Sequence, residues 1–158
     1  MQLSFQICLG VLAALSTSAN GLIFRDRITQ DVQGTVSTLL HGAQGQDEVK
    51  FNVDAHGPKF NGWEFDTEGQ PDTDAVIRPI NSTATLVCKE GSICNLDLNG
   101  DEQQVFRLAK VNESTFSFQD TMSSLYVSRT ADLSLELSDS VTDASYFTLN
   151  KITNSEKR

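Results

Sequence analysis

Histidine, cysteine and tryptophan are scarce in this 158-residue chain, which contains two histidines, three cysteines and one tryptophan. His41 and His56 each precede a glycine, so we expect both side chains to lie in solvated loops. No H-E-x-x-H, G-x-S-x-G or phosphate-cradling glycine motif occurs, and no cysteine and histidine spacing suits zinc. The sequence therefore indicates no catalytic residue, metal ligand or cofactor, and it favours a binding protein over an enzyme.

One acidic stretch has part of the spacing of a calcium loop. Asp97, Asn99 and Asp101 match the first three ligand positions. Glu102 stands where the sharp turn needs glycine, and Leu108 where a bidentate glutamate is required. We therefore expect no calcium site here.

Basic residues are few as well: 12 Lys and Arg stand against 21 Asp and Glu, which gives a net charge of −9. Such a surface repels phosphate backbones and anionic lipid, which argues against nucleic acid and membrane-surface partners. Cationic or neutral ligands remain compatible with it.

Long hydrophobic runs are missing except near the start, where residues 5–15 form an apolar stretch within an uncharged segment, 1–19, that ends in small residues. A run this short cannot span a bilayer, but it is typical of a secretory signal. We therefore expect a signal peptide at 1–19, a single domain at 20–158, and a secreted protein of the extracellular space or cell wall.

Removal of the signal would take away Cys8 and leave Cys88 and Cys94. In a hairpin with its turn centred on Gly91, these two cysteines occupy directly opposite positions. Secretion favours oxidation, so we expect a Cys88–Cys94 disulfide. The same route predicts N-glycosylation at Asn81 and Asn112, each of which begins an N-x-S/T sequon between predicted strands.

The most regular pattern is a repeat of two 13-residue segments, 86–98 (LVCKEGSICNLDL) and 125–137 (LYVSRTADLSLEL), offset by 39 residues. Each has an apolar strand, a polar turn and a strand reading L-x-L. A period near 40 residues is typical of a supersecondary unit that buries its apolar face only against neighbouring copies. The alternation of residues predicts strands at 22–26, 36–40, 48–53, 63–67, 75–80, 84–89, 93–98, 104–110, 115–120, 125–128, 133–137 and 146–150.

Twelve short strands with this period predict an all-β fold, a β-trefoil of three roughly 40-residue units with four strands each. A β-sandwich is the alternative. The first unit is the most divergent. Counting back from the aromatic residue of each fourth strand aligns Phe51 with Leu135 and places Leu39 opposite Phe51.

Three triplets occupy equivalent positions in the three units: Asn61-Gly62-Trp63, Gln104-Val105-Phe106 and Ser145-Tyr146-Phe147. They resemble the Q-x-W signature of ricin-B-type trefoil lectins, and the chain more loosely resembles small secreted fungal cell-wall trefoil proteins. Only the second triplet keeps the glutamine, so the sugar-binding residues of those lectins are not carried over. The resemblance implies that Trp63, Phe106 and Phe147 pack in the core.

Alternation along the hairpin at 125–137 places Leu135 towards the core and Ser134, Glu136 and Tyr126 towards solvent. An exposed tyrosine can stack on the apolar face of a sugar ring, and Asp132 in the turn can accept a bond from a sugar hydroxyl. Each also has a simpler interpretation, an isolated surface aromatic and a turn-forming aspartate.

We therefore expect a non-catalytic binding protein whose partner is a glycan or cell-wall polysaccharide. One alternative is a protease inhibitor of the Kunitz-trefoil type, with its reactive loop at residues 66–75, which include Pro71. The other is a secreted effector that acts on a host protein.

Overall fold

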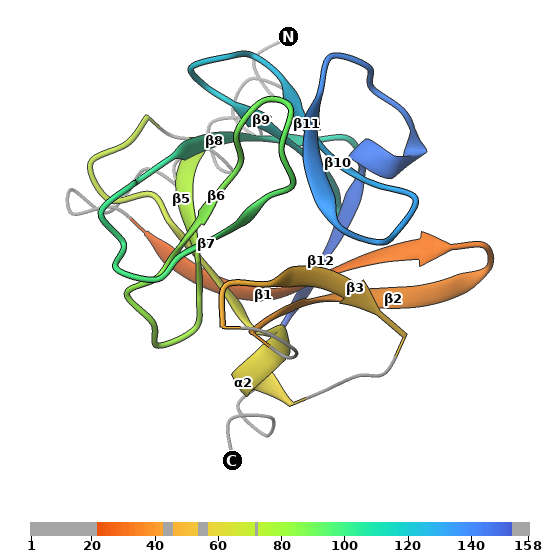
Figure 1. The fold of residues 1–158 in the computed structure, drawn as a ribbon, viewed down its shortest axis with the longest axis horizontal. Helices are drawn as coiled ribbons and strands as arrows, with labels where there is room; N and C mark the ends of the chain where they lie inside the picture. The colour runs from red at the N-terminus through yellow and green to blue at the C-terminus, as the bar shows by residue number, and fades with distance from the viewer. Residues whose placement is uncertain (1–21, 43–45, 54–56, 72, 153–158) are drawn as a thin grey trace, which may run out of the picture.

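The computed structural model describes residues 22–42, 46–53, 57–71 and 73–152 (Figure 1). This part of the chain is almost entirely β-structure, with one α-helical turn, α2 (Pro58–Asn61), and one 3-10 turn, η1 (Asp143–Ser145). The strands are β1 (Ile23–Val32), β2 (Thr35–His41), β3 (Val49–Asn52), β4 (Trp63–Asp66), β5 (Asp74–Pro79), β6 (Thr85–Val87), β7 (Asn95–Asp97), β8 (Val105–Lys110), β9 (Thr115–Asp120), β10 (Tyr126–Arg129), β11 (Leu135–Ser138) and β12 (Phe147–Lys151).

Each of the twelve strands predicted from the sequence is found, with ends that differ by a few residues. The largest difference is at β1, which continues to Val32 although the alternation predicts its end at Asp26. The extra length has a structural reason, because β1 pairs with β4 along residues 23–26, with β12 along 26–29 and with β2 along 29–32.

Six strands form a closed ring of antiparallel pairs, in the order β1, β4, β5, β8, β9, β12 and back to β1. A β-sandwich would consist of two separate sheets packed face to face, so that alternative is wrong. Closure leaves each ring strand paired on both sides, which protects its backbone groups from pairing with other chains.

The other strands form three hairpins, β2–β3, β6–β7 and β10–β11, which Figure 1 shows arranged about the middle of the molecule. Each group of four consecutive strands thus gives its first and fourth strands to the ring and its second and third to a hairpin. Backbone bonds join every pair of hairpins: Phe51 N to Leu133 O (2.8 Å), Leu96 N to Asp47 O (2.9 Å) and Cys94 N to Leu135 O (2.7 Å).

The registers of the hairpins correct the offset of the repeat. Leu86 pairs with Leu96 in β6–β7, and Val127 pairs with Leu137 in β10–β11. Val127 and Leu137 therefore correspond to Leu86 and Leu96, which gives an offset of 41 residues where the sequence pattern gives 39. A shift of two residues keeps every side chain on the same face of a strand, so alternation alone cannot detect it.

The first unit is offset from the predicted alignment in the same way. Leu39 pairs with Phe51, as predicted. Phe51 corresponds to Leu137, however, because Asp47 and Leu133 accept equivalent bonds and lie four residues before Phe51 and Leu137 respectively. The predicted alignment of Phe51 with Leu135 is therefore wrong by two residues.

The aromatic residues of the three triplets lie in the core, as the resemblance implies. Trp63, Phe106 and Phe147 each have 0% of their surface exposed. Phe147 stacks on Phe118, with a centroid distance of 4.9 Å, and faces Phe51 at 6.2 Å. The ring strands and the first hairpin therefore share one hydrophobic interior.

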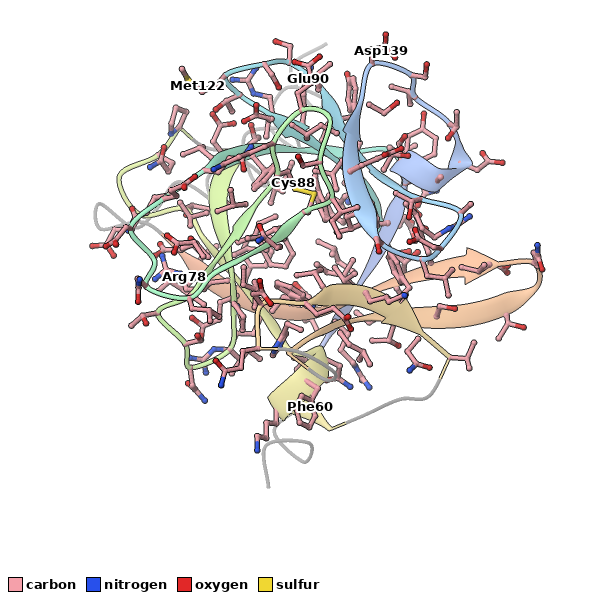
Figure 2. The ribbon with its side chains drawn as sticks, viewed as in Figure 1. Phe60, Arg78, Cys88, Glu90, Met122 and Asp139 are labelled. Atoms are coloured by element: carbon pink, nitrogen blue, oxygen red, sulfur yellow. A yellow bond between two sulfur atoms is a disulfide. The ribbon has the colours of Figure 1, made fainter. Side chains whose placement is uncertain are left out.

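The Cys88–Cys94 disulfide is present, with the two Cα atoms 4.2 Å apart, so that prediction is confirmed. Cys88 lies near the middle of the view in Figure 2, among the hairpins. The side-chain amide of Gln104 fixes the backbone of Cys88 from both sides: its Oε1 accepts from Cys88 N (2.6 Å), and its Nε2 donates to Cys88 O (2.9 Å). The one glutamine retained in the Q-x-W-like triplets thus holds the hairpin against the ring.

Candidate functional site

A groove of about 250 Å³ lies between the first hairpin and the turn of the third. We call it groove 1. It is lined by Leu40, Glu48, Lys50, Phe51, Asn52, Val53 and Leu133.

Groove 1 combines an apolar wall with polar side chains. Leu40 and Phe51 are almost fully buried and form its floor, while Val53 is 59% exposed. Lys50 and Asn52, on either side of Phe51 in β3, add an ammonium group and a side-chain amide. Such a surface suits a small ligand that has one apolar face and a rim of hydroxyl groups.

The backbone of the turn is strained where it lines this groove. Leu133 has φ = 71°, a left-handed conformation that is rare for a residue with a branched apolar side chain. Two hydrogen bonds hold it there, from its N to Thr130 O (3.1 Å) and from Phe51 N to its O (2.8 Å). Strain of this kind is often found at functional sites, where the surrounding structure maintains it.

Asp132, predicted as a ligand-binding residue, precedes Leu133 and is exposed beside groove 1. The hydroxyl of Thr130 donates to its carboxylate, and this bond lowers the pKa of Asp132, with a smaller contribution from the charge of Lys50. The carboxylate is therefore ionised at neutral pH, and Lys50 is close enough to influence it.

Tyr126, the other predicted ligand-binding residue, is half-buried at the start of β10, opposite Ser138 and Gln119. Asp132 lies in the turn beyond Arg129, at the other end of that strand. At about 3.3 Å per residue, the strand alone separates the two by roughly 10 Å. The structure does not bring Tyr126 and Asp132 together, and Tyr126 is not among the residues that line groove 1.

Ser134, predicted to face solvent, is buried, with 6% of its surface exposed. Its N–H donates to the hydroxyl of Thr130 (3.1 Å), and its carbonyl accepts from Thr130 N (2.9 Å). Ser134 therefore belongs to the turn, where strand alternation does not apply. Leu135 is buried and Glu136 exposed, as predicted.

Asn81 and Asn112, the predicted glycosylation sites, both lie in turns and are exposed. Asn81 follows β5 with φ = 56°. The side-chain oxygen of Asn112 accepts from Thr115 N (3.1 Å). Both positions are accessible to a modifying enzyme.

The described part of the loop predicted as a reactive site, residues 66–71 and 73–75, is compact. Thr67 and Asp74 are buried, at 8% and 4% exposed. Backbone bonds from Gln70 to Thr67 (3.0 Å) and from Asp74 to Pro71 (2.9 Å) fold it into tight turns. A protease inhibitor needs a long exposed loop, so this segment gives no support to that alternative.

No family model and no curated protein matches the chain. Two solved structures are similar to it. The structure described as "SeviL bound to asialo-GM1 saccharide" has a TM-score of 0.66 and 12% identity, and the match covers 84% of this chain and 100% of that one. A Caenorhabditis elegans protein with unknown function has a TM-score of 0.60 and 10% identity, covering 86% of this chain and 99% of that one. Identities this low show a shared all-β fold and nothing about the site.

Within the described residues, no group of three or more histidine, cysteine, aspartate or glutamate side chains is placed to hold a metal ion. Asp97, in the stretch with calcium-loop spacing, accepts backbone bonds from Asn99 (3.3 Å) and Glu102 (2.8 Å) and so shapes a turn. The same residues include no helix with the length and apolar character to cross a membrane.

His41 is buried at the end of β2, with 5% of its surface exposed, so the expectation of a solvated loop is wrong. Its Nε2 donates to the carbonyl of Gly62 (2.7 Å), and its ring meets Trp63 edge to face at 4.8 Å. The glycine after His41 marks the end of the strand. The partners of His41 come from a distant segment, which sequence spacing does not reveal. His56 lies outside the described residues.

Acidification is expected to destabilise the protein through His41. Burial lowers the pKa of His41 below its usual 6.5, and this effect exceeds the opposite effect of the bond to Gly62. The unfolded chain therefore takes up the proton at a higher pH than the folded protein does. The contribution of His41 to the free energy of unfolding is complete above the pKa of the unfolded chain, and it is lost as the pH falls towards the pKa of the folded protein. Urea midpoints measured from about pH 7.5 to 4.5 should fall more steeply in the wild type than in His41→Gln, which keeps a donor but does not titrate.

Asp26 is a second buried titratable group, and burial raises its pKa, an effect opposed by the charge of Lys151. The contribution of Asp26 to the pH dependence of stability has the opposite sign to that of His41. It is the same in the wild type and in His41→Gln, so it cancels when the two are compared. Equal slopes for the wild type and His41→Gln would contradict the assignment.

Proposed function

We propose that this chain is a secreted β-trefoil protein that binds carbohydrate without catalysis, with a saccharide unit held in groove 1. The observation that carries the proposal is the groove itself, in which an apolar wall meets Lys50 and Asn52, with the ionised Asp132 beside it. The arrangement of three four-strand units supports the trefoil assignment. The saccharide bound by a protein of similar fold supports the class of ligand.

A pyranose ring fits the chemistry of groove 1. Its apolar face of C–H groups would cover Val53, which is 59% exposed, and its hydroxyls would meet Lys50, Asn52 and Asp132. A carboxylate accepts hydrogen bonds from hydroxyls, an ammonium group donates them, and an amide does both. A ligand with alternating donors and acceptors can therefore be matched by these three side chains.

The proposal includes the compartment and modifications of the protein. Secretion is supported by the apolar segment at 1–19 and is consistent with the Cys88–Cys94 disulfide. Glycosylation at Asn81 and Asn112 is supported by the exposure of both side chains. In this proposal the protein binds carbohydrate in the extracellular space or the cell wall.

Carbohydrate binding by groove 1 is tested with one substitution on its wall. The purified protein is applied to a glycan array and to insoluble polysaccharides, and Val53→Asp is compared with the wild type. A carboxylate on the apolar wall should weaken binding to groove 1 at least about tenfold, because it removes apolar contact and must lose its own hydration.

Val36→Asp is the matched control, because Val36 is also an exposed valine, at 63%, but pairs with Asp31 of β1 and does not line groove 1. It should bind as the wild type does. A blank array at high protein concentration, or an equal loss in Val36→Asp, would refute the proposed function.

A further inference from the structure

A second groove, of about 310 Å³, lies between the second hairpin and the turn of the first. We call it groove 2. It is lined by Asp47, Val87, Lys89, Asn95, Leu96, Asp97, Leu98 and Glu102.

Grooves 1 and 2 occupy equivalent positions in successive units. Each lies where the second strand of one hairpin donates a backbone bond to the turn of another, from Phe51 N to Leu133 O (2.8 Å) and from Leu96 N to Asp47 O (2.9 Å). The two donors occupy the same register position, since Phe51 faces Leu39 as Leu96 faces Leu86.

The apolar wall is retained from one groove to the other. The register matches Leu40 to Val87, Phe51 to Leu96, and Val53 to Leu98. In each groove the last residue of the wall is exposed, Val53 at 59% and Leu98 at 44%.

The third equivalent position lacks this wall. The register places Ser128 where the grooves have Leu40 and Val87, and Asp139 where they have Val53 and Leu98. Asp139 is exposed at the periphery of the molecule (Figure 2). A serine and an aspartate cannot offer an apolar surface to a sugar ring, so two of the three positions have the same character.

The polar side chains of groove 2 are arranged around an ion pair. Lys89 and Glu102 lie 3.4 Å apart and neutralise each other, and Asp97 is occupied by backbone N–H groups of its own turn. Asn95 stands where groove 1 has Lys50. The groups facing a ligand are therefore an apolar wall, the amide of Asn95 and the carboxylate of Asp47, which can exchange hydrogen bonds with the hydroxyls of an uncharged ring.

The disulfide stabilises the walls of this groove. Val87 and Lys89 flank Cys88, and Asn95 follows Cys94, so the crosslink fixes the spacing of both sides. A site that is already ordered loses less entropy when it binds a ligand.

We propose that groove 2 is a second site for a neutral pyranose unit, so that one protein molecule bridges two units of a repeating or branched glycan. This inference rests on the proposed function of groove 1. It adds a consequence that a single site lacks, because two sites on one chain crosslink multivalent glycans and gain avidity.

The experiment compares Leu98→Asp, Val53→Asp and the double variant, each of which introduces the residue found at the third position. The probe is the glycan with the strongest array signal, titrated in soluble form by calorimetry, and then coupled to beads for agglutination. The expected stoichiometry is two ligands for the wild type, one for each single variant and none for the double variant. Either single substitution should abolish agglutination and leave soluble binding.

Val36→Asp again serves as the control and should keep both ligands. A wild-type stoichiometry of one, or unchanged binding in Leu98→Asp, would overturn the second site while the proposed function stands. Binding to no glycan would overturn both. Since Leu98 is exposed, Leu98→Asp should keep the fold, and the thermal transition of the variant checks this directly.

Discussion

Phe147→Ala is expected to destabilise the protein by about 3–5 kcal/mol, the usual cost of truncating a buried aromatic residue. Phe147 is fully buried and links Phe118 of the ring with Phe51 of the first hairpin. The cavity would open where the closing strand β12 meets the core, at a place where the surrounding strands are each paired and cannot collapse inward. Since a domain of this size has about 5–15 kcal/mol of stability, the loss is a large part of it.

The measurement is a thermal or urea transition followed by circular dichroism and by fluorescence of Trp63, the one tryptophan of the chain. The midpoint temperature should fall by more than about 10 °C. Met122→Ala is the control, because Met122 is 92% exposed at the periphery (Figure 2), and it should change the free energy of unfolding by less than about 0.5 kcal/mol. A cost below about 1 kcal/mol for Phe147→Ala would show that this ring does not anchor the core.

Gly100→Ala is expected to cost at least about 2–3 kcal/mol, more than a glycine in a turn usually contributes. Gly100 has φ = 70°, and a Cβ atom there would lie 2.0 Å from the carbonyl oxygen of Thr83. The loop cannot move away easily, because Asp97 anchors it through the backbone of Asn99 and Glu102. The substitution must therefore displace either the backbone of Thr83 or the loop that Asp97 anchors.

Gly91→Ala is the matched comparison. Gly91 also has a positive φ, 79°, but no heavy atom lies within 4 Å of a Cβ placed there. It should cost only about 1–2 kcal/mol, the strain of the left-handed conformation itself. Denaturant unfolding of both variants separates this strain from the clash, and equal costs would mean that the approach to Thr83 is readily relieved.

The strands could be predicted from the sequence because their signal is local. Alternation and turn residues located all twelve, and opposite positions across one short turn located the Cys88–Cys94 disulfide. The aromatic triplets identified the core for the same reason, since a large apolar residue repeated once in each unit has few other roles.

Features that depend on contacts between distant segments could not be predicted in this way. The burial of His41 is due to Trp63 and Gly62, which lie in a distant segment. Ser134 was wrong for a local reason, because it belongs to a turn, where strand alternation does not apply. The repeat offset failed because shifts of two residues are equivalent on a strand.

The candidate site was predicted only at one edge. Asp132 lies beside groove 1, but Lys50 and Val53 come from another unit and carry no motif of their own. A correct alignment of the repeat would have revealed Val53, because it matches Val53 to Leu98, two apolar residues at one register position, but it matches Lys50 only to Asn95.

The pairing of β1 with β12 has a consequence for the newborn protein. Asp26 lies opposite Lys151, so one seam of the ring joins segments from nearly opposite ends of the described chain. While the ribosome is still working, the first strand has no final neighbour on that side, and its hydrogen-bonding groups remain open to other molecules. The barrel is completed only after the last strand has emerged, so we expect slow maturation and a need for protection by chaperones along the way.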